Sequence, residues 1–155
     1  MLFRSNLALT FFGNEKMDAL GKKRIMNIIN QGYKAVPELT TNTHFNENLP
    51  EYQNVYISNM RDQYVMVYNG KKWNLEERNP VIEQIFTDKR DFLIEKYEEL
   101  KSELPPHTIR KFDRFLRDQD DETVINDTKK EIQMILYNYK DLPIKTRKML
   151  SLKDK

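Results

Sequence analysis

The 155-residue chain contains no cysteine. Disulfides, thiol catalysis and every zinc site that uses a cysteine ligand are therefore excluded within it. No apolar run approaches the roughly 20 residues that a membrane-spanning helix needs. The short apolar stretch at 7–12 is not followed by the small-residue cleavage site of a secretory signal. We therefore expect an intracellular protein with no membrane partner, in the host cytoplasm or a viral factory if the protein is viral.

An excess of one charge sign is also missing. The 26 basic and 24 acidic residues leave a net charge of +2, so the field of the whole protein does not by itself indicate a nucleic-acid binder. Charged residues nevertheless make up 32% of the chain, and 8 Tyr, 8 Phe and 1 Trp accompany them. Because aromatic side chains bury large areas, this composition predicts a folded domain with a heavily charged surface.

The patterning predicts an α+β fold with short N-terminal helices, a three-stranded antiparallel β-meander and three C-terminal helices. We expect 1–12 to be irregular or non-native, 13–140 to form a single domain, and 141–155 to be a basic, frayed tail.

Two helices are expected near the N-terminus. The isoleucines of Lys23–Asn30 recur at helical spacing, and Gly32 is suited to end that helix. Tyr33–Thr43 predicts a second helix, with Pro37 in its first turn.

The centre of the chain changes to a period of two. Asn54–Ser58 and Tyr64–Tyr68 are rich in β-branched and aromatic residues, which predicts two strands joined by a polar turn. The pair 69–70, Asn-Gly, tolerates the two positive φ angles of a type I′ hairpin turn. A third strand is expected at Trp73–Leu75.

The C-terminal half is helical in pattern. We expect Asn79 to cap a helix and Pro80 to occupy its first position. The prolines at 105–106 end that helix, and a shorter one follows before the acidic run Asp118–Glu122. The last predicted helix presents an apolar stripe at Val124, Ile125, Thr128, Ile132, Ile135 and Tyr139.

The most polar group of residues near the predicted sheet contains one of the two histidines. A histidine there could act as the general base of a metal-dependent, HNH-like nuclease. The same residues could instead satisfy turn backbones and cap helix ends, which asparagines commonly do. A second histidine at ligand spacing is missing, and asparagine is a poorer metal ligand than carboxylate. We expect no cofactor within this chain. The residues of this cluster are His44, Asn46, Glu51, Asn54 and Asn59.

Basic residues gather in three places, at 22–24, at 71–72 and at 145–148. Lys22, Lys23 and Arg24 follow one another, and Lys71 and Lys72 directly precede the tryptophan, Trp73. Such a cluster beside an aromatic side chain could contact phosphates and a base of DNA or RNA. The alternative for each cluster is a solvated face, and for Trp73 it is packing against the helix that follows.

A set of short segments carries a resemblance to known proteins. It covers the chain from Phe12 almost to its end. The segments are Phe12-Gly13-Asn14-Glu15, Gly32 through Leu39, His44-Phe45-Asn46, Pro50-Glu51, Asn54-Val55-Tyr56-Ile57-Ser58-Asn59-Met60, Tyr64-Val65-Met66-Val67-Tyr68, Gly70-Lys71-Lys72-Trp73, Phe112–Leu116 and Asp120–Ile125. Together they resemble the C-terminal region of a family of uncharacterised proteins of giant DNA viruses.

Proteins of that family often carry a zinc finger and a coiled coil before this region. The resemblance therefore implies a non-enzymatic accessory domain that supports nucleic-acid association or assembly, and a homo-oligomer formed through an upstream coiled coil. A pure oligomerisation module and the nuclease are the alternatives. Leu2-Phe3-Arg4-Ser5 is what one frame of a common sequencing adapter encodes, so we expect a metagenomic fragment whose true N-terminus precedes this sequence.

Overall fold

The computed structural model describes residues 7–153, and the adapter-like tetrapeptide at 2–5 lies outside them. Six α-helices and a three-stranded sheet occur in the described part of the chain, which confirms the expected α+β class. The helices are α1 (Lys22–Ile29), α2 (Ala35–His44), α3 (Arg78–Leu100), α4 (Pro106–Asp118), α5 (Glu122–Asn138) and α6 (Asp141–Lys153).

The sheet is the expected antiparallel meander. Its strands β1 (Val55–Tyr56), β2 (Tyr64–Tyr68) and β3 (Trp73–Glu77) follow the order β1-β2-β3. The second strand has its predicted bounds, and the third is two residues longer than expected. The first strand is shorter than expected because the Ile57 amide leaves the ladder and donates to the carbonyl of Leu136, 3.1 Å away.

The turn between β2 and β3 differs from the type I′ expectation. No residue other than glycine has a positive φ among 7–153, so Asn69 does not adopt the geometry that such a turn requires. Instead the side-chain oxygen of Asn69 accepts hydrogen bonds of 3.0 Å from the amides of Lys71 and Lys72. Within this turn, Gly70 is the one residue with a positive φ, of 99°. The turn is therefore four residues long and is organised by an asparagine side chain.

The long helix α3 begins earlier than predicted. Its N-cap is Glu77, so Asn79 and Pro80 lie inside the first turn and do not start it. Proline is still tolerated there, because the first amides of a helix have no intrahelical acceptor. One side of α3 faces the core, and its buried residues recur at helical spacing: Ile82, Phe86, Leu93, Tyr97 and Leu100.

The expected frayed tail is instead a helix, α6, across Asp141–Lys153. Its Thr146 is buried, and the Thr146 hydroxyl donates to the side-chain oxygen of buried Gln53. The helix that was expected to be the last, α5, ends at Asn138, and Tyr139 is 51% exposed where an inward position was expected. The hydrogen bond between Thr146 and Gln53 thus fixes the C-terminal segment on the domain. The spacing of apolar residues in the sequence does not indicate this contact.

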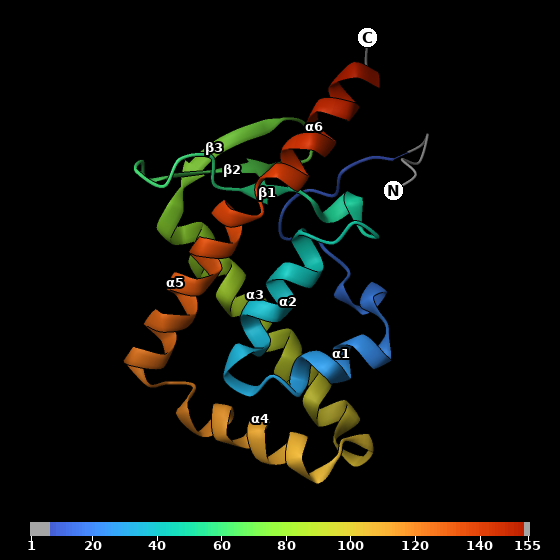
Figure 1. Cartoon of the computed structure of the whole chain (residues 1–155), viewed down its shortest axis with the longest axis vertical. Helices are drawn as coiled ribbons and strands as arrows, with labels where there is room; N and C mark the ends of the chain where they lie inside the picture. The colour runs from blue at the N-terminus through green and yellow to red at the C-terminus, as the bar shows by residue number, and fades with distance from the viewer. Residues whose placement is uncertain (1–6, 154–155) are drawn as a thin grey trace.

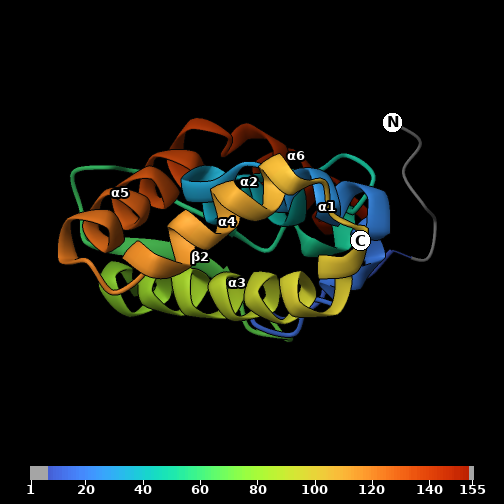
Figure 2. The ribbon, with the colours of Figure 1, turned by 90° about the horizontal axis from the view of Figure 1, so that it is seen from below.

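In Figure 1 the sheet lies near the top with α1 to α5 below it, and α6 lies at the level of the sheet and extends past it. Seen from below, α3 runs along one side, and α2, α5 and α6 lie across from it (Figure 2). One continuous core fills the space between, and the aliphatic residues of β1 and β2 join it from above: Val55, Val65 and Val67. No helix within 7–153 is both long enough and apolar enough to span a bilayer.

Candidate functional site

His44 lies at the end of α2 and is fully buried. Its Nδ1 is 2.9 Å from the carbonyl oxygen of Tyr52 and 2.9 Å from the side-chain oxygen of Asn54. Its Nε2 is 2.8 Å from Nζ of Lys89, which is 1% exposed. Both partners of Nδ1 are acceptors and Lys89 is a donor, so Nδ1 carries the proton and Nε2 accepts.

Burial and the neighbouring Lys89 charge lower the pKa of His44 to about 4, so the imidazole is neutral at pH 7. Burial also lowers the pKa of Lys89 to about 8, against the opposing pull of Glu15 and Asp88. Burial alone would raise the pKa of Glu15. The charges that His44 and Lys89 can carry, and the hydrogen bonds from Asn54 and Gly13, lower it instead. At neutral pH the cluster therefore holds a cationic lysine and an anionic glutamate around a neutral histidine.

This cluster fastens the segment before α1 to the body of the domain. The side-chain nitrogen of Asn54, Nδ2, donates to the Glu15 carboxylate at 2.7 Å and to the carbonyl of Thr10 at 3.0 Å. The ring of Phe12 lies 5.9 Å from the ring of His44. All polar atoms of the imidazole are used in these contacts, so the geometry gives His44 a structural role and leaves it no face toward a substrate.

The other members of the predicted polar cluster are spread out. Asn46 donates to the carbonyl of Asn42 at 3.0 Å and accepts from the Asn48 amide at 2.9 Å, which closes the end of α2. Glu51 lies in a short 3₁₀ turn, and its carbonyl accepts from the Thr10 amide at 2.9 Å. Asn54 is the member of the cluster whose side chain bonds to His44. Within 7–153, no group of three or more histidine, aspartate or glutamate side chains could hold a metal ion.

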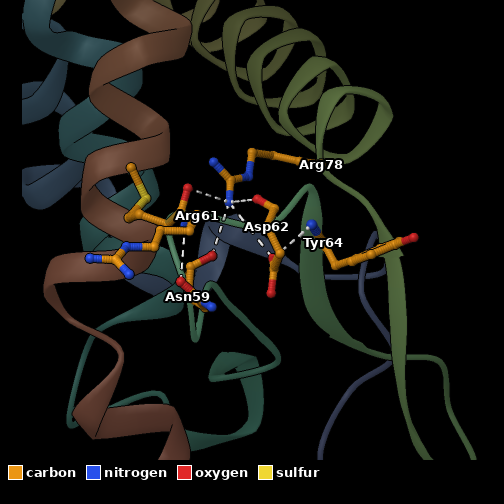
Figure 3. A network of polar contacts seen from close by, with 6 residues as sticks. Asn59, Arg61, Asp62, Tyr64 and Arg78 are labelled. Atoms are coloured by element: carbon orange, nitrogen blue, oxygen red, sulfur yellow. Dashed lines mark hydrogen bonds and ion pairs between the residues drawn. The ribbon is translucent and has the colours of Figure 1, made fainter.

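Asn59 belongs to a separate network at the start of α3 (Figure 3). The Asn59 side chain accepts from the Arg61 amide at 2.9 Å, and the Arg78 guanidinium donates to the Asn59 carbonyl at 3.1 Å. The same guanidinium reaches the carbonyls of Met60 and Asp62. Arg78 thereby holds the loop between β1 and β2 against the first turn of α3, which is a structural task.

The basic cluster on α1 is partly neutralised. The Lys22 ammonium pairs with the carboxylate of Glu103, and the guanidinium of Arg24 donates to Asn42 at 3.5 Å. Lys23 is exposed. In Figure 1, α1 lies well below the sheet, so this cluster and the one at 71–72 lie on different parts of the molecule.

The basic cluster at 71–72 directly precedes Trp73, which lies among aromatic rings and a third cation. The Trp73 ring centroid is 5.3 Å from that of Tyr56 and 5.9 Å from that of Tyr68. The guanidinium of Arg147, from α6, lies 5.2 Å from the centre of the same ring. Arg147 also donates to the Tyr56 hydroxyl at 2.9 Å. Trp73 therefore packs against α6 and the neighbouring strands, and it holds Arg147 in place.

A hollow of about 440 Å³ opens beside this stack, and we call it the Trp73 cleft. Its lining includes the cations Lys71, Lys72 and Arg147 and, within the described part of the chain, no carboxylate. Among residues 7–153 no carboxylate forms an ion pair with any of the three. The full lining is Leu7, Ala8, Leu9, Tyr68, Lys71, Lys72, Trp73, Arg147, Leu150 and Ser151.

A larger hollow lies between α3 and α5, and it differs from the Trp73 cleft in how its lysines are paired. That hollow, of about 600 Å³, is also lined by lysines, but its Lys129 pairs with Glu83 on the opposite helix. One of the two lysines that line this hollow is therefore paired within the protein. In the Trp73 cleft the positive charge is left for solvent or a ligand.

Sequence reasoning missed Lys89, Glu15 and Arg147. A signal for Lys89 was present, because it continues the i, i+3, i+4 spacing of the α3 stripe between Phe86 and Leu93. Arg147 was noted only as one of the basic residues of a supposed tail. Its position beside Trp73 depends on how α6 folds back on the sheet, which local sequence does not encode.

No family model matches this chain, and neither a curated protein nor a solved structure matches it.

Proposed function

We propose that this chain is a non-enzymatic accessory domain that associates with nucleic acid through the Trp73 cleft. The observation that carries the proposal is a set of three cations around one hollow, Lys71, Lys72 and Arg147, with no carboxylate partner among residues 7–153. Phosphate contacts from lysine and arginine supply most of the affinity of non-specific nucleic-acid binding. With a net charge of only +2, a local concentration of this kind is what such binding needs.

Two further features support the same function. The Arg147 guanidinium is held by the Trp73 ring and the Tyr56 hydroxyl, so little side-chain entropy is lost when it contacts a phosphate. The Asn69 side chain fixes the backbone of Lys71 and Lys72 through their amides. The site is therefore preorganised at its backbone and at one of its three cations.

The test is fluorescence anisotropy of labelled DNA and RNA over a range of salt concentrations. Binding should weaken steeply with salt, and Lys71→Glu with Lys72→Glu should abolish it. Lys130→Glu is the matched control, because Lys130 is on α5 outside the cleft and the charge change per site is the same. A second comparison uses Lys22→Glu with Lys23→Glu on α1. Absence of binding at low salt, or equal losses in all variants, would refute the proposal.

The wider context rests on the resemblance to the giant-virus proteins. As part of the proposal, the domain accompanies a zinc finger and a coiled coil, and the coiled coil brings copies together. The upstream reading frame tests this: a two-cysteine two-histidine motif there supports it, and an in-frame stop codon directly upstream refutes it.

A further inference from the structure

The sheet has two faces of different character. Along β2 the side chains alternate, so that Val65 and Val67 are buried while Tyr64, Met66 and Tyr68 point to the opposite face. We call that opposite side the outer face. The register pairs Met66 with Leu75 and Tyr68 with Trp73, so both β3 residues lie on the outer face too. The strand residues on it are Tyr56, Tyr64, Met66, Tyr68, Trp73, Leu75 and Glu77.

The outer face is covered at one end only. At the Trp73 end, Tyr56 is 5% exposed and Arg147 of α6 lies over the indole. At the other end, Tyr64 is 48% exposed and Leu75 is 57% exposed. Figure 3 shows the Tyr64 ring directed away from the Arg78 network. Tyr64 and Leu75 are diagonal neighbours across the strand pair, so their exposed side chains form one continuous surface.

The two ends of this face also differ in charge. Lys71 and Lys72 lie in the turn directly before Trp73, whereas Glu77 faces Tyr64 at the far end. An anionic chain that enters at the Trp73 cleft is therefore attracted at one end of the sheet and repelled at the other. The part of a ligand that lies over Tyr64 should be uncharged and flat.

We infer that the outer face is a stacking platform for the bases of single-stranded nucleic acid, with Tyr64 as its exposed ring and the Trp73 cleft holding the adjacent phosphates. This inference rests on the proposed function and names its substrate class. From Tyr68 to Tyr64 the platform is roughly 14 Å long, as the rise of an antiparallel strand gives. Bases in a duplex are stacked on one another and cannot lie on a protein ring, whereas unpaired bases can.

The charge pattern favours nucleic acid over a protein partner. An apolar peptide could also cover Tyr64 and Leu75, but it would leave Lys71, Lys72 and Arg147 without counter-charges. A single strand satisfies both parts of the surface at once, with bases on the rings and phosphates on the cations.

The experiment compares four probes on the full chain: a short single strand, the same strand without bases, the corresponding duplex, and inorganic polyphosphate. Each base that stacks on an aromatic ring adds to the affinity, so the base-bearing strand should bind roughly ten-fold tighter than the abasic strand. Trp73 is the only tryptophan, and its fluorescence reports occupation of the cleft by any of the four.

Variants separate the two parts of the surface. Tyr64→Ala should remove the advantage of the base-bearing strand, Tyr64→Phe should keep it, and polyphosphate binding should be unchanged in both. Tyr139→Ala, which removes a tyrosine of similar exposure just after α5, is the control. Circular dichroism confirms that each variant is folded.

The outcomes distinguish this inference from the proposed function. If all four probes bind the wild type and Tyr64→Ala alike, the cleft binds phosphates but the platform is refuted. If the duplex binds as tightly as the single strand, the platform is likewise refuted. If no probe binds, both proposals fail, and light scattering that shows a concentration-dependent dimer broken by Leu75→Lys would assign the outer face to a second copy of this chain.

Discussion

The ammonium nitrogen of Lys89 lies 2.8 Å from Nε2 of His44, and both side chains are buried. The contact joins α3 to α2 across the core, and Glu15 supplies a negative charge near both residues. A histidine that sequence reasoning considered as a catalytic base is thus the acceptor of a buried lysine. Its surroundings lead to predictions about stability.

Lys89→Met should destabilise the fold by about 2–3 kcal/mol at pH 7. Methionine fills a similar volume but leaves Nε2 of buried His44 without its donor, and it removes the positive charge that lies near Glu15. A buried acceptor without a donor and a buried charge without compensation are both costly. Urea unfolding measures the loss. In the double variant with Glu15→Gln, part of the stability should return, because no unpaired charge is left. Strictly additive losses would show that the two residues are not coupled.

The free energy of unfolding should fall as pH drops from about 6.5 to about 4. The folded-state pKa of His44, about 4, is below the usual value of 6.5, so the unfolded chain binds more protons in that window. Above pH 6.5 His44 is neutral in both the folded and the unfolded chain, and none of this stability is lost. The loss that its protonation causes at low pH amounts to about 3 kcal/mol.

A His44→Gln variant should unfold with a flatter pH dependence across that window. Residual slope below pH 5 is expected from carboxylates such as Glu15, whose stabilising contribution is also lost as they become protonated. A slope as steep as that of the wild type would contradict the assignment to His44.

Gly70→Ala should cost about 1–2 kcal/mol and weaken the turn before the Trp73 cleft. Gly70 has φ of 99°, a conformation that side chains disfavour, and an added Cβ would lie 3.3 Å from Cβ of Phe11. Thermal unfolding measures the loss. Gly21→Ala is the comparison, because Gly21 also has a positive φ, of 86°. Apart from its neighbours in the chain, no described atom lies within 4 Å of the Cβ that alanine would add there. The loss should be larger for Gly70→Ala, because only there would the added Cβ meet the Phe11 side chain.

Arg147→Lys should lower nucleic-acid affinity several-fold although the charge is kept. Lysine cannot reproduce the planar guanidinium that covers Trp73 and donates to Tyr56. The Trp73 emission spectrum should shift at the same time, which reports the lost contact without any ligand. Arg114→Lys, on α4 and outside the cleft, is the matched control and should change neither measurement.

Local pattern was enough for much of the fold, and the individual elements show why. Ile25, Ile28 and Ile29 could be assigned to the inner face of α1, and Tyr64–Tyr68 to a strand, because the spacing of apolar residues reflects which side of an element meets the core. The turn after β2 was located correctly but given the wrong geometry. Asn69 can serve a turn either by adopting positive φ or by accepting with its side chain, and the residue type does not distinguish the two.

The sequence by itself determined the α+β class, the order of the strands and the apolar face of α1, because these depend on residues that are close together in the sequence. Only the tertiary structure decided which polar residues meet. In the folded chain His44 contacts Lys89, Asn59 contacts Arg78, and Arg147 lies beside Trp73. Such contacts join residues tens of positions apart, and a hydrogen bond between them leaves no periodic trace in the sequence.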